Sequence, residues 1–223
     1  MQSEASTSTP LCRPMWQHFR VVHSRFPPKN VFDTNDHDAF LLAQVESSTN
    51  DRLFNWSSYI EVEDFHHGDG WGALMASFCY PRRGRFSSDE RGAYYCSKNI
   101  ETAIIEWSFH TARFWQEHGW TDEVSAVVRS YTGRIVEDLL DVRNDESLHH
   151  RDDYQKSIAF ADIAYKNKAY GIMYRSVRNS GSECLALLRP VASTPVKQSA
   201  HYTLIFNGQN FESYAKLGDL KKI

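Results

Sequence analysis

Apolar residues recur along this chain at two different periods, and the order of these periods limits the folds that the chain can adopt. The spacing typical of an amphipathic helix occurs over 99–118 and over 152–168. Asn99 favours the start of a helix, and Gly119 favours its end. Strand-like segments gather toward the C-terminal end and do not alternate strictly with the helices. This order predicts an α+β fold, with a mixed or largely antiparallel sheet and flanking helices.

The expected strands are short, and most are bounded by glycine, proline or polar residues. Gly133 is expected to form a turn, with 135–139 as the continuation or the partner of the strand before it. The strands are expected over 19–23, 73–80, 92–97, 124–131, 170–175, 184–188 and 202–206. The sequence contains no Gly-x-Gly-x-x-Gly and no Walker motif, so a dinucleotide would not be bound in those standard ways.

The length of the chain suits one domain. A chain of 223 residues can bury a sizeable core, whereas two full domains would be a tight fit. Residues 1–14 are mostly polar and show no structural period, so we expect a flexible N-terminal tail followed by a single domain over 15–223. The stretch 34–69 is also mostly polar, and its role stays open.

Composition argues against several classes of partner. The net charge is −3 with both signs interspersed, so direct binding of nucleic acid is not expected. No apolar run reaches the roughly 18 residues of a membrane span. The cysteines are scattered and are expected to be buried reduced thiols, and the polar N-terminus does not resemble a signal peptide. These features predict a cytoplasmic protein.

The side chains best suited to chemistry lie close together in the segment 84–106, GRFSSDERGAYYCSKNIETAIIE. Arg85 lies in an expected turn, Tyr95 on a strand and Glu106 inside the following helix. Arginine can bind a pyrophosphate bidentately, tyrosine offers an aromatic face and a hydroxyl, and a carboxylate can stabilise developing positive charge. From the residues alone, plainer roles stay open: a solvated loop for Arg85, core packing for Tyr95 and a polar helix edge for Glu106.

Three short motifs follow one another here: Gly84-Arg85-Phe86-Ser87, Gly92-Ala93-Tyr94-Tyr95-Cys96-Ser97 and Glu101-Thr102-Ala103-Ile104-Ile105-Glu106. In residue type and order they resemble the core of the RES domain, the toxin of RES–Xre toxin–antitoxin pairs. The resemblance extends upstream to 19–22 and downstream to 170–178, and covers 19–207 in all. The chain differs from the usual pattern at Ser87, where the family often has asparagine. Its polar stretch 34–69 is also longer than expected for a compact member of the family.

The resemblance implies a fold, an activity and a site. The fold would be a compact core similar to that of ADP-ribosyltransferase toxins, with NAD⁺ in a cleft. The activity would be degradation of NAD⁺ by hydrolysis or phosphorolysis of its nicotinamide–ribose bond. The arginine, glutamate and serine that name the family correspond to Arg85, Glu106 and Ser176, with Tyr95 as the accompanying aromatic. Glu106 would then be catalytic, and the other three would bind NAD⁺, which is the substrate.

The resemblance also implies an Xre-type antitoxin as a partner and leaves the oligomeric state open, a homodimer included. Two other functions stay open: transfer of ADP-ribose to a protein target, and a non-catalytic binding module. No metal is expected, because the histidine pairs at 66–67 and 149–150 have no third ligand at a recognised spacing.

Overall fold

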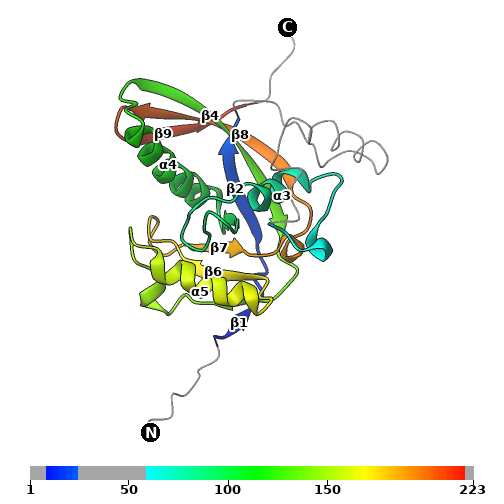
Figure 1. Cartoon of the computed structure of the whole chain (residues 1–223). Helices are drawn as coiled ribbons and strands as arrows, with labels where there is room; N and C mark the ends of the chain where they lie inside the picture. The colour runs from blue at the N-terminus through cyan, green and yellow to red at the C-terminus, as the bar shows by residue number, and fades with distance from the viewer. Residues whose placement is uncertain (1–8, 25–58, 219–223) are drawn as a thin grey trace.

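The fold is built on a mixed sheet, as the order of the sequence patterns predicts (Figure 1). The computed structural model describes residues 9–24 and 59–218. The strands are β1 (Leu11–Cys12), β2 (Gln17–His23), β3 (Tyr94–Ser97), β4 (Glu123–Arg134), β5 (Leu139–Asp141), β6 (Gly171–Arg175), β7 (Glu183–Leu187), β8 (Lys197–Asn207) and β9 (Phe211–Lys216). The α-helices within these ranges are α3 (Gly72–Cys79), α4 (Ile100–Glu117) and α5 (Gln155–Lys166).

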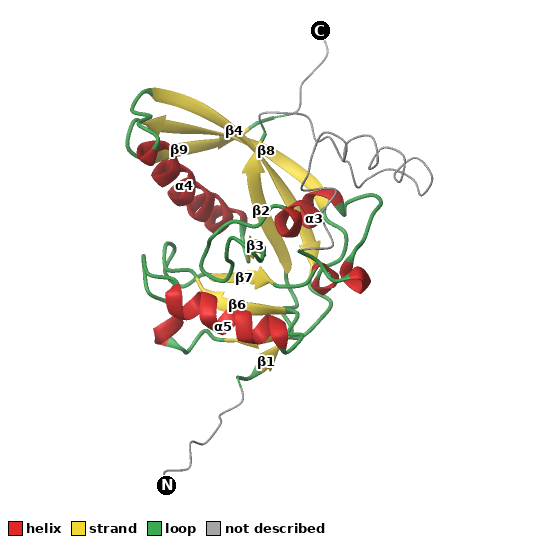
Figure 2. Ribbon diagram, viewed as in Figure 1, coloured by secondary structure: helices red, strands yellow, loops and turns green. Residues whose placement is uncertain are grey.

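The sheet has nine strands among the described residues, in the order β1-β5-β6-β7-β3-β2-β4-β8-β9. Only β5 and β6 pair in parallel; the other neighbours are antiparallel. The pair β2–β3 is the shortest in the sheet, because it contains a single register pair, Phe19 with Ser97. In Figure 2, β6 and β7 cross the direction of β2, β4 and β8. The sheet therefore consists of two halves that meet at β2 and β3.

Each α-helix in the described part of the chain covers its own apolar core. Ile104 of α4 shares a core with Val21 of β2, and Ala161 of α5 shares one with Ala186 of β7. Helix α3 contributes to a third core that includes Leu185 of β7. Burying these apolar side chains is the main favourable contribution to folding.

The alternation of side chains along a strand decides which face each helix covers. On β2, Val21 belongs to the α4 core, whereas Val22 packs against the α3 core. On β7, Ala186 belongs to the α5 core and Leu185 to the α3 core. Helix α3 thus lies on one face of the sheet, and α4 and α5 lie on the other, one on each half.

The prediction of a strand at 73–80 is wrong, because this segment forms α3. Its buried residues include Leu74, Met75, Phe78 and Cys79, whose spacing places them along one face of a helix. A short apolar run of this kind fits a buried strand or a buried helix, and periodicity alone does not separate the two.

The prediction of a turn at Gly133 is also wrong, since β4 continues through it and pairs it with His18 of β2. A Cβ at this position would lie 2.8 Å from His18 Nε2, so the glycine permits close approach of a buried ring. Residue 135 makes an isolated bridge to Ser193, and the next strand begins only at Leu139.

The sheet also begins and ends beyond the expected bounds. Strand β1 lies inside the segment 1–14 that we expected to be a flexible tail, and it pairs with β5. Strand β9 was not expected; it pairs with β8 and is mostly exposed. Residues 1–8, and 34–58 of the polar stretch 34–69, lie outside the described residues.

One buried ion pair fastens the segment that precedes α3. Asp64, with a side chain 2% exposed, accepts two hydrogen bonds from Arg189, at 2.7 Å from Nε and 2.8 Å from Nη2. Asp64→Asn should lower the free energy of unfolding by about 3 kcal/mol, because it leaves a largely buried guanidinium without its counter-charge. Urea denaturation measures this loss.

Asp138→Asn is the matched control, because it removes the same kind of carboxylate from an ion pair at the surface. Asp138 and its partner Arg13 are both about half exposed. Asp138→Asn should lower the free energy of unfolding by only about 0.5 kcal/mol. Equal losses in the two variants would show that the buried pair does not fasten the segment.

Candidate active site

Helix α4 positions the central carboxylate. Its first turn is capped by Asn99, whose side chain accepts a hydrogen bond of 2.8 Å from Thr102 N. Thr102 and Glu106 are one helical turn apart and so lie on the same face of α4. This face meets the segment 176–182 that follows β6, where Thr102 Oγ1 lies 2.7 Å from Ser182 Oγ. The polar face of α4 is therefore joined to the other half of the sheet.

Ser176 supplies the most direct link across this junction. Its hydroxyl donates a hydrogen bond of 2.6 Å to Glu106 Oε1. Ser176 Oγ also accepts hydrogen bonds from the backbone N–H groups of Arg178 and Asn179, at 3.2 and 2.9 Å. Ser176 thus caps its own turn and holds the carboxylate, so the structure brings together the two residues that the sequence places 70 positions apart.

The surroundings of Glu106 act on the ionisation of its carboxyl group in two opposite directions. Burial raises the pKa of the Glu106 carboxyl above its ordinary value. The hydrogen bond from Ser176 and the positive charges of Arg178 and Arg85 act in the opposite direction. A carboxylate in such a place interacts strongly with any positive charge that develops beside it, because the local dielectric constant is low.

Arg85 is buried and is fixed by backbone carbonyls. Its Nη1 donates to the carbonyl oxygens of Leu148 and His150, at 2.9 and 2.8 Å. Its guanidinium carbon lies 4.7 Å from the centre of the Tyr154 ring, just before α5. Among the described residues no carboxylate forms an ion pair with Arg85, so its bonds orient the guanidinium without neutralising it.

Tyr95 acts on Arg85 through the turn that carries it. Its hydroxyl accepts a hydrogen bond of 2.8 Å from Phe86 N and donates one of 3.0 Å to Ser87 Oγ. A Cβ at Gly84 would lie 2.8 Å from this hydroxyl, so the turn closes tightly on Tyr95. The resemblance implies that Tyr95 binds NAD⁺; in the structure its hydroxyl bonds the turn that carries Arg85.

A model of the RES domain family matches residues 61–207, which include Arg85, Tyr95, Glu106 and Ser176. The chain belongs to the RES domain family. Among solved structures, it is similar to a chain of the M. tuberculosis MbcT–MbcA toxin–antitoxin complex, at 12% identity over 93% of this chain and 86% of that chain, with a TM-score of 0.46. No curated protein matches the chain.

Two residues of this RES domain were missed by the sequence reasoning, and both lie near Glu106. His110 follows Glu106 by one turn of α4. Although the residue is exposed overall, partial desolvation of its ring and the positive charges of Arg178 and Arg85 lower the pKa of His110 to about 4. Arg178 follows Ser176 by two residues, and its side chain is only 4% exposed. The helical spacing from Glu106 was the signal for His110. Arg178 ends the segment 170–178 of the family resemblance, but nothing in that segment indicated that its side chain lies near Glu106.

The histidines at 149 and 150 serve loop structure. His149 Nδ1 lies 2.7 Å from Asp145 O, and its Nε2 accepts a bond from Arg175 N. His150 Nδ1 accepts bonds from two backbone N–H groups, those of Asp152 and Asp153. No group of three or more His, Cys, Asp or Glu side chains suited to hold a metal ion occurs within 9–24 and 59–218. In the same ranges no helix is long and apolar enough to cross a membrane.

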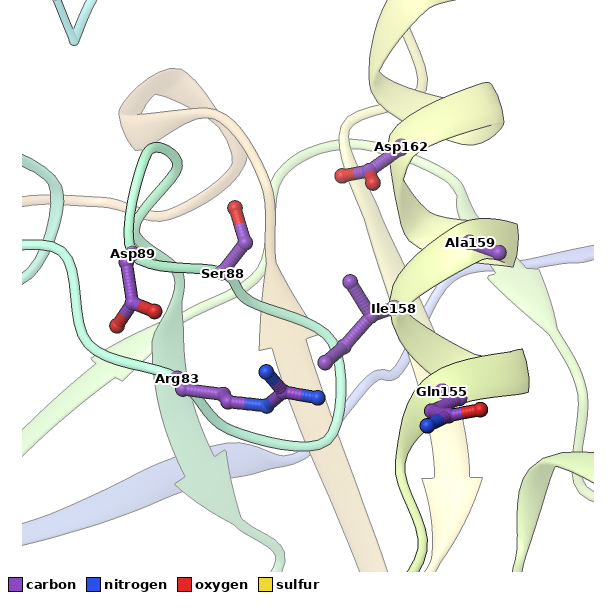
Figure 3. Close-up of a pocket in the computed structure, with 7 residues that line it drawn as sticks. All are labelled: Arg83, Ser88, Asp89, Gln155, Ile158, Ala159 and Asp162. Atoms are coloured by element: carbon purple, nitrogen blue, oxygen red, sulfur yellow. The ribbon is translucent and has the colours of Figure 1, made fainter.

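A hollow of about 240 Å³ lies between the loop before β3 and helix α5 (Figure 3). Asp162 lines it and also accepts two hydrogen bonds from Arg91, which fasten the loop to α5. The lining residues are Arg83, Ser88, Asp89, Gln155, Ile158, Ala159 and Asp162. None of them is a predicted site residue, so the hollow is separate from the residues around Glu106.

The raised pKa of Glu106 leads to a prediction about stability. A carboxyl whose pKa is higher in the folded state than in the unfolded state costs stability when ionised, and this cost disappears as the pH falls through the folded pKa. Glu106→Gln should therefore melt at a higher temperature than the wild type at neutral pH, with a difference that shrinks in acid. Thermal unfolding over a series of pH values measures it.

Glu101→Gln provides the control, because Glu101 is exposed in the first turn of the same helix. Its melting temperature should not rise at neutral pH. If Glu106→Gln melts below the wild type at neutral pH, the compensation by Ser176 and the arginines outweighs the cost of burial.

Proposed function

We propose that this RES domain breaks the nicotinamide–ribose bond of NAD⁺ and passes the ADP-ribosyl group to water or phosphate. The observation that supports it best is the buried Glu106 carboxylate, held at 2.6 Å by Ser176 with the charges of Arg85 and Arg178 around it. Family membership supports the same activity. We further propose that the protein acts on the NAD⁺ of the cytoplasm.

Glu106 would stabilise the transition state of this cleavage. As the bond between the ribose carbon and the pyridinium nitrogen breaks, its electron pair goes to the nitrogen, and nicotinamide leaves as a neutral molecule. Positive charge then develops on the ribose, as in glycoside cleavage generally. Among the described residues, both hydrogen bonds to Glu106 go to Oε1, one of them from Cys184 Sγ at 4.0 Å. Oε2 is therefore the oxygen that would face the ribose or the acceptor.

Arg85 would bind the pyrophosphate of NAD⁺. Its bonds to the carbonyls of Leu148 and His150 hold the guanidinium in one orientation, so little conformational entropy is lost when an anion binds. Tyr95 would contribute by fixing the turn in which Arg85 lies. Ser176 would keep Glu106 in place and, in the bound state, contact the ribose next to the nicotinamide.

Turnover of NAD⁺ tests this proposal. The purified protein should release nicotinamide from NAD⁺, and comparison with and without added phosphate identifies the acceptor. Glu106→Gln should lower the rate by about 10²–10³-fold, because it keeps the shape of the side chain and removes the charge that the transition state needs. Liquid chromatography of the released nicotinamide measures the rates of the wild type and of Glu106→Gln.

Glu101→Gln should turn over NAD⁺ at the normal rate. Absence of nicotinamide release by a folded wild-type protein would contradict the proposal. Release only in the presence of a second protein, with a gain of mass on that protein, would favour ADP-ribosyl transfer; binding of NAD⁺ without cleavage would favour a non-catalytic module.

We also propose that an Xre-type antitoxin restrains the enzyme. The loop before β3 carries four arginines, but they divide into two pairs. Arg85 and Arg91 are buried and bonded within the chain, whereas Arg82 and Arg83 are exposed. An acidic segment of the partner would meet the exposed pair at the edge of the loop.

Expression without a partner tests the toxin proposal. The wild-type chain should arrest bacterial growth while cellular NAD⁺ falls, because nothing restrains the enzyme. The Glu106→Gln chain should permit growth, since it lacks the charge needed for turnover. Growth curves and extracted NAD⁺ measure this. Normal growth and normal NAD⁺ with abundant soluble wild-type protein would overturn it.

A further inference from the structure

Arg178 connects three segments that surround Glu106. It follows β6 and belongs to the turn that Ser176 caps. Its guanidinium carbon lies 3.5 Å from the centre of the Phe109 ring on α4. Its Nη2 donates a hydrogen bond of 2.6 Å to the carbonyl oxygen of Arg151, which precedes α5. One side chain thus holds the 176–182 segment against both α4 and the residues before α5.

The guanidinium of Arg178 is buried, and few polar or negatively charged groups contact it directly. Its nearest carboxylate oxygen is Asp152 Oδ1, at 3.3 Å, and the Asp152 side chain is 59% exposed, so this pair is weak. Its Nη1 is buried and has no hydrogen-bond partner in the part of the chain that the structure describes. A buried cation in this condition is costly unless another anion lies near.

Glu106 is that anion. It lies three residues before Phe109 on α4, and residues at this spacing are neighbours on the helix surface. Ser176 binds Glu106 from the same turn that carries Arg178. The carboxylate and the guanidinium are therefore held on one side of α4 by the same short turn, near enough for their charges to interact.

We propose that Arg178 is a positioning residue for Glu106: its buried guanidinium fixes the Ser176 turn against α4 and supplies the positive charge that keeps the Glu106 carboxylate ionised. Arg178 would act through Glu106 and need not touch the substrate. The part of this proposal that concerns turnover rests on the proposed function, whereas the effect on the charge of Glu106 does not.

The other groups that face Glu106 do not take over this role. Burial raises the pKa of Tyr174 on β6 well above its ordinary value and that of Cys184 on β7 to about 12, so both stay neutral. His110 on α4 has a pKa of about 4 and is therefore neutral at neutral pH. The positive charges that act on Glu106 are those of Arg178 and Arg85, and the effect of Arg178 is the larger.

A titration of Glu106 itself tests the proposal without any need for activity. The protein is labelled with ¹³C at its glutamate carboxyl groups, and the Glu106 signal is identified by its loss in Glu106→Gln. In Arg178→Gln the midpoint of this signal should move to higher pH, because a nearby positive charge has been removed. In Arg178→Lys, which keeps the charge, the midpoint should stay close to that of the wild type.

Arg175→Gln is the matched control. Arg175 lies three residues earlier and pairs with Glu146 at the surface, so its loss should leave the Glu106 midpoint unchanged. Arg178→Met provides a second neutral variant that can still pack on Phe109 if Arg178→Gln does not fold. An unchanged Glu106 midpoint in either folded neutral variant would overturn the proposal.

Turnover adds a second readout. In Arg178→Gln, kcat at neutral pH should fall about tenfold with a smaller change in KM, and its acid limb should move to higher pH together with the Glu106 midpoint. A uniform loss of kcat with no change in the pH profile would indicate a merely structural role and contradict the proposal. If the wild type does not release nicotinamide, the proposed function fails, while the titration still decides whether Arg178 keeps Glu106 ionised.

Discussion

The two halves of the sheet meet through a single register pair, Phe19 with Ser97, and the rest of the structure depends on how this narrow join is reinforced. Main-chain pairing contributes little there, so side chains must hold the halves together. On one face of the sheet the α3 core spans the join with apolar contacts. On the other face, polar contacts between α4 and the 176–182 segment span it, led by the bond from Ser176 to Glu106.

This second set of contacts explains why a carboxylate lies at the join. Polar groups in a junction are costly when they lack partners, and each hydroxyl here is satisfied: Thr102 and Ser182 bond each other, and Ser176 bonds Glu106 and its own turn. A purely apolar junction would be as stable or more so. The burial that raises the pKa of Glu106 is the same property that the proposed cleavage needs, since a carboxylate acts most strongly where water is excluded. Stability and proposed chemistry thus oppose each other at one residue.

Much of this arrangement could be predicted from the sequence where local signals are strong. Asn99 marked the start of α4, and Glu106 stood out because it interrupts an apolar helix. Ser176 could be paired with Glu106 only through the resemblance to the RES domain, because no local pattern links residues so far apart in the chain. The helix α3 was mistaken for a strand, since a short buried run lacks a distinctive period. The hydroxyl of Tyr95 could not be assigned, because its partners depend on how the preceding turn folds back.

Arg85 and Arg91 show most clearly what sequence alone leaves undecided. Both are arginines of the same loop, so composition and spacing do not distinguish them. Both are also buried in the structure. Arg91 bonds the carboxylate of Asp162, which neutralises its charge and leaves it a structural tie. Arg85 bonds only carbonyl oxygens in the described structure, which orient a guanidinium but leave its charge in place. Because an anionic ligand is attracted by net charge rather than by the residue type, Arg85 is the buried arginine of this loop that is suited to bind one.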